Sequence, residues 1–210
     1  MVVTDHSLPA SLYFGAGGRG DTKNTLNSMG RRGRSLLKDE TTFFVTTTVV
    51  NFDKVFTTDK YCDILIENIK HYQRRYKFQI FGYVIMPSHF HWIVEVKPEH
   101  GLISDIMRDI KKYSAWDLLE GLRKDGHSKL LTMFQLEARN HPGQKRKFWM
   151  KRFDDEYMRN DEMFHTKLEY IHNNPVTAGL VSNPEDYKYS SAKNYILGDH
   201  SVLEVNTDWC

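Results

Sequence analysis

The chain has 210 residues, of which 40% are hydrophobic, 27% charged and 13% aromatic, and its formal net charge is +2. This composition is typical of a soluble globular protein and excludes disordered and collagen-like chains. No apolar run approaches the roughly 18 residues of a membrane helix, and no signal segment opens the sequence, so we expect no membrane partner. The two cysteines, Cys62 and Cys210, are too few for a disulfide framework, which indicates a reduced, cytoplasmic protein.

The small net charge conceals an uneven distribution along the chain. Residues 101–152 carry 12 basic and 6 acidic side chains, whereas residues 153–210 carry 4 basic and 11 acidic ones. Such an asymmetry is typical of a basic binding face beside an acidic region. Ordinary solvated surface gives the same pattern, so charge alone does not separate the two interpretations.

The first 38 residues are predicted to be a disordered tail, because they are polar or rich in glycine and show little apolar periodicity. Within them, Gly15–Gly20 matches the G-x-G-x-x-G pattern of dinucleotide sites. That pattern requires a packed helix after the glycines, but residues 21–34 contain only Leu26 and Met29 as large apolar side chains. We therefore interpret the match as chance.

Apolar periodicity predicts strands and helices from about residue 41 onward. The strands are short runs rich in β-branched and aromatic residues, and the helices place apolar side chains three and four residues apart. Residues 123–147 are polar and contain Gly126, Pro142 and Gly143, so they are predicted to form a long loop. The predicted elements, in chain order, are strand 41–51, helix 58–76, strands 77–86 and 90–96, helix 101–122, strand 148–158 and helix 160–174.

The last of these helices has recognisable ends. Asn160 suits the N-cap position, and Pro175 disfavours helical geometry at the residue before it, which predicts the end at residue 174. The order β-α-β-β-α-β-α predicts an α+β fold: a ferredoxin-like split βαβ unit, with helices on one face of an antiparallel sheet, plus one C-terminal helix. We expect residues 39–182 to form this domain and residues 183–210 to be a C-terminal extension.

Two histidines, two residues apart, lie at the start of the strand predicted at 90–96. In Ser88-His89-Phe90-His91-Trp92, the side chains of His89 and His91 point to one face, and those of Phe90 and Trp92 to the other. Two imidazoles on one face can bind a metal ion, although two histidines do not select which metal. For such a pair taken alone, hydrogen-bonded or solvent-facing histidines are the simpler interpretation.

Three polar residues share a stripe of the last helix. Tyr170 and Asn174 are four residues apart, and Lys167 precedes the tyrosine by three. Tyr170 borders a predicted apolar face, so its hydroxyl group can project into a site. The simpler alternative is a tyrosine at the rim of the core with a solvated hydroxyl group.

A basic segment with aromatic residues precedes the last helix. Cations that alternate with rings can neutralise phosphates and stack on unpaired bases. A solvated loop that leads into a buried strand gives the same pattern, and both interpretations stay open. The residues that we predict to bind DNA are Lys145, Arg146, Lys147, Trp149, Lys151 and Arg152.

Taken together, these features resemble those of the single-tyrosine HUH transposases, in particular the REP-associated tyrosine transposases. The resemblance rests on residues 83–91, YVIMPSHFH, and on residues 170–181, YIHNNPVTAGLV. Residues 149–153 and 184–191 also resemble family segments. The resemblance spans roughly residues 41–195 in the family's order, and leaves out residues 1–38 and 123–147.

The resemblance implies a metal-dependent transposase or endonuclease that cleaves single-stranded DNA with a hairpin or palindrome. His89 and His91 would bind Mg²⁺ or Mn²⁺, and Tyr170 would attack a phosphate to form a 5′-phosphotyrosine link. Asn174 occupies the position of the family's third ligand, and we add the hypothesis that Lys167 stabilises the phenolate. The resemblance also implies a protein at the bacterial nucleoid, and leaves monomer and homodimer open.

Two other classes of function are compatible with parts of this pattern. A non-catalytic nucleic-acid-binding module on a ferredoxin-like sheet would stack bases on the aromatic residues of the sheet. A metallohydrolase would use the histidine pair, but it would need further His or carboxylate ligands. The other histidines show no clear motif spacing, which disfavours the second alternative.

Overall fold

The computed structural model describes residues 41–139 and 143–209. The predicted disordered tail, with its glycine-rich match, therefore lies outside the described residues. Four strands form one sheet in the order β2-β3-β1-β4, and all neighbouring strands are antiparallel. The strands are β1 (Thr42–Thr48), β2 (Gln79–Met86), β3 (His89–Glu95) and β4 (Asp154–Tyr157).

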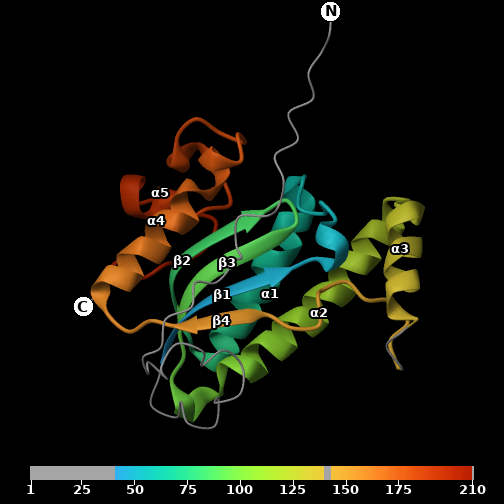
Figure 1. The fold of residues 1–210 in the computed structure, drawn as a ribbon, viewed down its shortest axis with the longest axis horizontal. Coiled ribbons are helices and arrows are strands. Elements are labelled where there is room, and N and C mark those ends of the chain that lie inside the picture. The colour runs from blue at the N-terminus through green and yellow to red at the C-terminus, as the bar shows by residue number, and fades with distance from the viewer. Residues whose placement is uncertain (1–40, 140–142, 210) are drawn as a thin grey trace, which may run out of the picture. The chain divides into compact units, whose positions relative to one another are not determined.

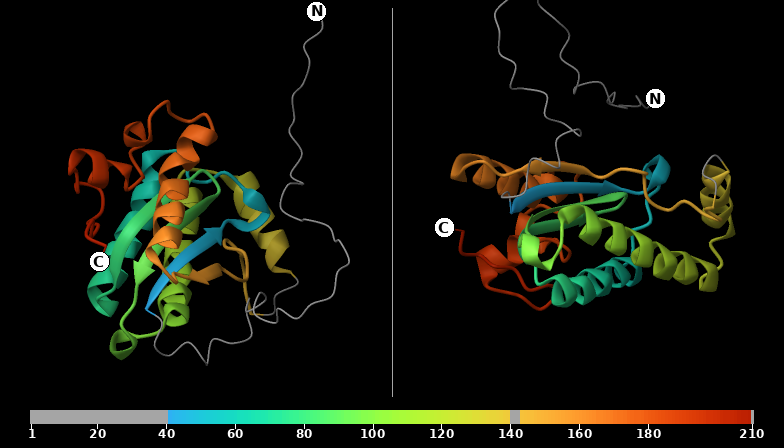
Figure 2. Two further views of the ribbon diagram at one scale, coloured as in Figure 1. Left: turned by 60° about the vertical axis from the view of Figure 1, so that its left-hand side comes forward. Right: turned by 90° about the horizontal axis from the view of Figure 1, so that it is seen from below.

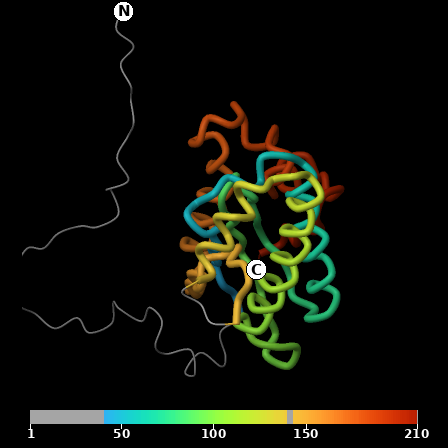
Figure 3. The backbone as a smooth tube through the Cα atoms, turned by 90° about the vertical axis from the view of Figure 1, so that its right-hand side faces the viewer, coloured from blue at the N-terminus to red at the C-terminus, as the bar shows by residue number. Residues whose placement is uncertain are grey.

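The predicted ferredoxin-like α+β fold is confirmed. Helix α1 (Asp59–Tyr76) connects β1 to β2, and helix α2 (Ile103–Lys124) follows β3, so the first elements run β-α-β-β-α in chain order. Figures 1 and 3 show α1 and α2 side by side on one face of the sheet. Helix α4 (Asp161–Thr177) lies across the opposite face (Figure 2).

Alternation along the strands produces two cores. Phe90 and Trp92 face α1 and α2 and belong to the larger core, as predicted for this side of β3. The smaller core on the other face joins Phe44 and Ile93 of the sheet to the apolar stripe of α4, which consists of Phe164, Leu168 and Ile171. Because α4 buries this stripe on the sheet, the next side chains around the helix come to lie beside β1 and β3.

The prediction of a loop over residues 123–147 is wrong in its middle, where helix α3 (Ser128–Ala138) forms. The side chain of Phe134 is fully buried, and its ring lies 5.1 Å from that of Phe148, centroid to centroid. The Lys147 amide also donates to the Phe134 carbonyl oxygen over 2.8 Å. Six of the eleven residues of this helix are apolar, and Phe134 and Ala138 are buried, so the polar composition of residues 123–147 as a whole conceals a short apolar helix.

The strand predicted at 148–158 is shorter than expected. Trp149 forms an isolated bridge with Val49, and the continuous strand β4 begins only at Asp154. The intervening residues leave the ladder after the Met150 amide has donated to the Thr48 carbonyl oxygen.

Helix α4 continues beyond the predicted end at residue 174. Pro175 is buried inside the helix, which ends at Thr177, and Gly179 just beyond the end has a φ of +67°. The Leu180 amide donates to the Pro175 carbonyl oxygen and the Gly179 amide to that of Val176, each over 2.9 Å. This paired arrangement is a Schellman motif, which glycine favours because it adopts positive φ without a steric penalty.

The residues after α4 close the outer edge of β2. Ser190 forms a bridge with Val84, and the Ser191 amide donates to the Tyr83 carbonyl oxygen over 2.9 Å. Helix α5 (Ala192–Leu197) follows. None of the helices in residues 41–139 and 143–209 is both long and apolar enough to cross a membrane.

Candidate active site

The two predicted histidine ligands lie at the start of β3, on the face covered by α4. His89 is opposite Thr48 of β1, and His91 is opposite Thr46. The centroids of the two imidazole rings are 4.8 Å apart. The structure therefore brings the histidines together on one face, as the alternation of the strand predicts.

His91 is held in a buried, oriented position. Its side chain is 5% exposed, and its ring stacks on that of Phe44 at a centroid distance of 5.6 Å. The Thr46 hydroxyl group lies 2.8 Å from Nδ1 of His91. Nε2, on the other side of the ring, is buried and has no hydrogen-bond partner.

An unpartnered buried nitrogen is unusual, because nearly all buried polar atoms are hydrogen-bonded. When Nδ1–H donates to the Thr46 hydroxyl oxygen, the lone pair of His91 lies on Nε2 and can bind a metal ion. Ser88 occupies the equivalent position beside His89, with its hydroxyl oxygen 3.1 Å from Nδ1.

Both imidazoles are neutral at neutral pH. Burial lowers the pKa of His89. Burial, together with the nearby His89 and the positive charge of Lys167, lowers the pKa of His91 to about 3. Metal binding requires the neutral imidazole, so the surroundings keep both side chains in the form that can act as ligands.

Tyr170 of α4 lies directly against His91. The centroids of their rings are 5.2 Å apart, and the Tyr170 ring also contacts Phe44 at 6.1 Å. The tyrosine is 44% exposed, so its side chain borders solvent beside the histidines. Asn160 caps this helix as predicted, by accepting a hydrogen bond from the Met163 amide over 2.9 Å.

Asn174 lies one helical turn after Tyr170. Its Nδ2 atom is buried without a hydrogen-bond partner, so it is a second orphaned polar atom among the predicted ligands. Because the two ends of an amide have nearly the same shape, turning the group places Oδ1 at this position as an acceptor. The His91 nitrogen and the Asn174 amide both lack partners that a bound metal ion would supply, so these side chains fit the predicted metal.

Lys167 lies near the site but has another partner. Its ammonium group is 2.8 Å from a carboxylate oxygen of Glu156 on β4, and 4.7 Å from the centroid of the Phe44 ring. Phe44 in turn contacts the rings of both His91 and Tyr170. Lys167 and Tyr170 therefore both contact the ring of Phe44.

The structure separates the basic–aromatic segment into two groups. Lys145, Arg146, Lys151 and Arg152 are exposed, and Lys147 is partly buried. Trp149, which we predicted to bind DNA, is buried: it is 5% exposed and its indole N–H donates to the Ser114 hydroxyl group over 3.1 Å. The indole ring contacts the rings of Phe56 and of Phe90 on β3, which removes it from solvent.

The same segment lies next to β1, on the side opposite β3. The Met150 amide donates to the Thr48 carbonyl oxygen, and Asp154 is already paired with Thr46. The exposed Lys151 and Arg152 between them therefore lie about two strand spacings, roughly 10 Å, from the histidine strand.

Thr46 was missed in the sequence, although it orients a predicted ligand. The run of threonines in β1 carried a signal of strand structure, but nothing in it indicated which hydroxyl group faces a histidine. That relation depends on the register between β1 and β3. His172, two residues after Tyr170, contacts the segment after α4, since its Nε2 lies 2.8 Å from the Ser191 hydroxyl oxygen.

The other two functional classes find little support in the geometry. Among the residues that the structure describes, no three His, Cys, Asp or Glu side chains are grouped so as to hold a metal ion, as a metallohydrolase would require. A module that stacks bases on its sheet needs an open sheet face. Helices instead cover both faces here, and Phe44 and Ile93 are buried under α4.

Comparison with known proteins assigns the family. A family model described as "Transposase IS200 like" matches residues 43–174, which include both histidines, Tyr170 and Asn174. The chain belongs to the IS200-like transposase family. Membership in this family supports a DNA-processing activity of the transposase class.

A solved structure of a transposase shares the fold. A REP-associated tyrosine transposase bound to a REP hairpin superposes with a TM-score of 0.56 at 23% sequence identity, over 81% of this chain and 86% of that one. A putative transposase from Deinococcus radiodurans R1 gives a TM-score of 0.40 at 15% identity, over 75% of this chain and 96% of the other. No curated protein matches the sequence.

Proposed function

We propose that this IS200-like transposase cleaves and rejoins single-stranded DNA through a covalent 5′-phosphotyrosine intermediate on Tyr170. The observation that carries the proposal is the contact between Tyr170 and His91, 5.2 Å between ring centroids, beside a buried His91 Nε2 that has no partner. The buried Nδ2 of Asn174, one helical turn after Tyr170, also lacks a partner and supports the proposal.

The proposed step exchanges one phosphoester bond for another. The phenolate oxygen of Tyr170 attacks the phosphorus atom, and the bond from phosphorus to the 3′ oxygen breaks. The 3′ oxygen takes up a proton and leaves as a hydroxyl group, while the 5′ side stays on the tyrosine. Attack by a 3′-hydroxyl group on this link reverses the step and joins strands, so no external energy source is needed.

His89, His91 and Asn174 would hold the divalent ion at this site. We propose Mg²⁺ or Mn²⁺, because an amide oxygen suits these ions and Mn²⁺ also accepts imidazole nitrogen. When bound, the ion would polarise the phosphate oxygens and so compensate for the weak nucleophilicity of a phenol, whose ordinary pKa is near 10. Thr46 and Ser88 orient the two imidazoles from behind.

For Lys167 we propose a role in stabilising the phenolate of Tyr170. Its ammonium group is already near the site, over the Phe44 ring, but is paired with Glu156. A lysine in this role would favour the ionised tyrosine by charge. Replacing Lys167 by Met should therefore slow cleavage, whereas a lysine that only packs on Phe44 would leave the rate unchanged.

The proposed partner is single-stranded DNA that contains a hairpin or palindrome. The exposed Lys145, Arg146, Lys151 and Arg152 offer charges to its phosphates. The alternative is a family member that binds nucleic acid without cleaving it. The two functions differ in one result: substitution of Tyr170 removes cleavage from the first and changes nothing measurable in the second.

The test uses the purified chain, Mn²⁺ or Mg²⁺, and a set of labelled single-stranded hairpin oligonucleotides. We expect a covalent protein–DNA adduct that survives denaturing electrophoresis. Tyr170→Phe should abolish both the adduct and cleavage but keep DNA binding. Tyr157→Phe, which changes a tyrosine of β4 that contacts Phe43, is the matched control. A Tyr170→Phe protein that still forms the adduct would contradict the proposal.

A further inference from the structure

A strained turn follows β1 on the side of the metal site. Asn51 and Phe52 both have positive φ, 57° in each case, and the Asp53 amide donates to the Val50 carbonyl oxygen across the turn. Two successive residues with positive φ are usually Asn followed by Gly. A bulky phenylalanine in this conformation is an outlier, because its Cβ atom comes too close to the following carbonyl oxygen.

Packing does not explain the phenylalanine. Its side chain is 63% exposed, more than that of any other large hydrophobic residue in the described part of the chain. The ring gains little from burial, and a glycine would relieve the backbone strain. Backbone strain of this kind clusters at functional sites, where the side chain has a task that a better-suited residue lacks.

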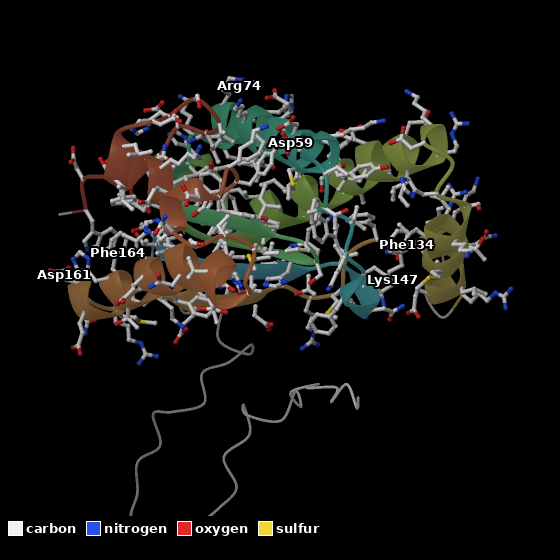
Figure 4. All side chains as sticks on the ribbon, turned by 90° about the horizontal axis from the view of Figure 1, so that it is seen from above. Asp59, Arg74, Phe134, Lys147, Asp161 and Phe164 are labelled. Atoms are coloured by element: carbon white, nitrogen blue, oxygen red, sulfur yellow. The ribbon has the colours of Figure 1, made fainter. Side chains whose placement is uncertain are left out.

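The turn is attached at both ends to the residues that precede His89. On one side, the Val49 amide donates to the Ser88 carbonyl oxygen over 2.8 Å, and on the other the Phe56 amide donates to the Pro87 carbonyl oxygen over 2.9 Å. Both ends of the turn are therefore anchored to Pro87 and Ser88, which directly precede His89. Figures 2 and 4 show the short blue coil after β1 on the side of the sheet where α4 lies, away from α1 and α2.

The turn lies beside the basic–aromatic segment, and its Asn51 side-chain amide donates to the Glu137 carboxylate over 3.1 Å. The Val50 amide donates to the Phe148 carbonyl oxygen over 2.8 Å, which joins the turn to the basic–aromatic segment. Figure 4 places Lys147 beside the coil. Lys54, two residues after Phe52, is exposed, and so are Lys145 and Arg146, which directly precede Lys147 in the chain. The rings of this basic segment itself, Phe148 and Trp149, are buried in the core, so they offer nothing to a base.

We infer that Phe52 is the base-stacking residue of this surface: a nucleobase of a single strand that crosses the metal site stacks on its exposed ring. Cations beside an accessible ring are the arrangement that binds single strands without reading their sequence. The inference deepens the proposed function and rests on it, because that function places single-stranded DNA at the metal site. The strained turn holds the ring out of the core, and the phosphates of the same strand meet the exposed cations.

The test measures binding of two fluorescein-labelled probes to the full chain at one low salt concentration. One probe is an oligothymidylate of 20 nucleotides. The other is an abasic DNA strand of the same length, which keeps the phosphates and lacks the bases. Phe52→Ala should weaken binding of the oligothymidylate about tenfold and leave the abasic probe unchanged. Phe52→Trp should restore binding. Equal losses on both probes, or none on either, would overturn the inference.

Two further variants separate stacking from a structural role. Trp116→Ala removes a ring that is 57% exposed on α2, which packs on the sheet face away from α4. This substitution should leave the affinities for both probes unchanged. Phe52→Gly should keep or raise the melting temperature, since glycine accepts the positive φ, and should still weaken oligothymidylate binding. A lower melting temperature together with weaker binding would assign Phe52 to the fold instead. Binding is measured without cleavage, so failure of the Tyr170 mechanism would leave this result interpretable.

Discussion

The hydroxyl group of Thr46 lies 2.8 Å from Nδ1 of His91, across the pairing of β1 with β3. A hydrogen bond at this nitrogen fixes the ring and leaves the buried, unpartnered Nε2 available to a metal ion. Groups in this position usually affect metal affinity by 10- to 100-fold. Thr46 is therefore a positioning residue for the proposed metal site, although it does not touch the metal or the DNA itself.

Thr46→Val should weaken Mn²⁺ binding about tenfold or more while preserving the fold, because valine keeps the shape and removes the hydroxyl group. Thr46→Ser, which retains the hydroxyl group, should bind Mn²⁺ with nearly the wild-type affinity. Titration calorimetry with Mn²⁺ alone measures both. Equal affinities of the valine variant and the wild-type protein would exclude the positioning role.

Lys151 and Arg152 should contribute to DNA binding through charge alone. Replacing either by Ala should weaken binding of a single-stranded oligonucleotide and reduce the slope of log affinity against log salt by about 0.7, the value for one phosphate contact with a single strand. Fluorescence anisotropy at several salt concentrations gives this slope. A slope that is unchanged in both variants would place the strand elsewhere.

Trp149→Ala is expected to act differently from those two substitutions. The indole ring is buried and donates a hydrogen bond to Ser114, so its loss should lower the free energy of unfolding by about 3–5 kcal/mol. Urea denaturation measures this change. A stable Trp149→Ala protein with a specific defect in DNA binding would restore the role that the sequence suggested.

Gly82 of β2 provides space for the helix that carries Tyr170. A methyl group at this position would lie 2.7 Å from Cδ1 of Leu168 and 3.6 Å from Cδ1 of Ile171. Gly82→Ala should therefore push α4 outward, destabilise the protein by about 1–3 kcal/mol and slow cleavage. Leu168→Ala removes the closest atom, so the double variant should lose less stability than the two single changes predict together.

Asp125 should contribute to acid sensitivity. The Lys60 ammonium group donates to its carboxylate over 2.7 Å and the Tyr61 hydroxyl group over 2.8 Å, and these bonds lower the pKa of Asp125. Because the folded-state pKa lies below the unfolded one, the stabilisation is present above about pH 4 and disappears as the pH falls through the folded-state pKa. Asp125→Asn should flatten the fall in melting temperature below pH 4. Identical profiles for both proteins would contradict this assignment.

The amino-acid sequence alone was sufficient for the main elements and for the histidine pair. Period-two alternation puts His89 and His91 on one face of a strand whatever surrounds it, and helical spacing puts Tyr170 and Asn174 on one stripe. These are local geometric consequences of the backbone. The fold class followed because the order of strands and helices permits few topologies.

Only the tertiary structure determined which side chains meet. The register of β1 brings Thr46 to His91, and the burial of α4 brings Tyr170 to the same ring. The fate of the aromatic residues also depended on packing: Trp149 fills the core while Phe52 stays exposed on a strained turn. Composition shows that a ring is present, but whether solvent or protein surrounds it depends on neighbours distant in the chain, and only the folded arrangement supplies those neighbours.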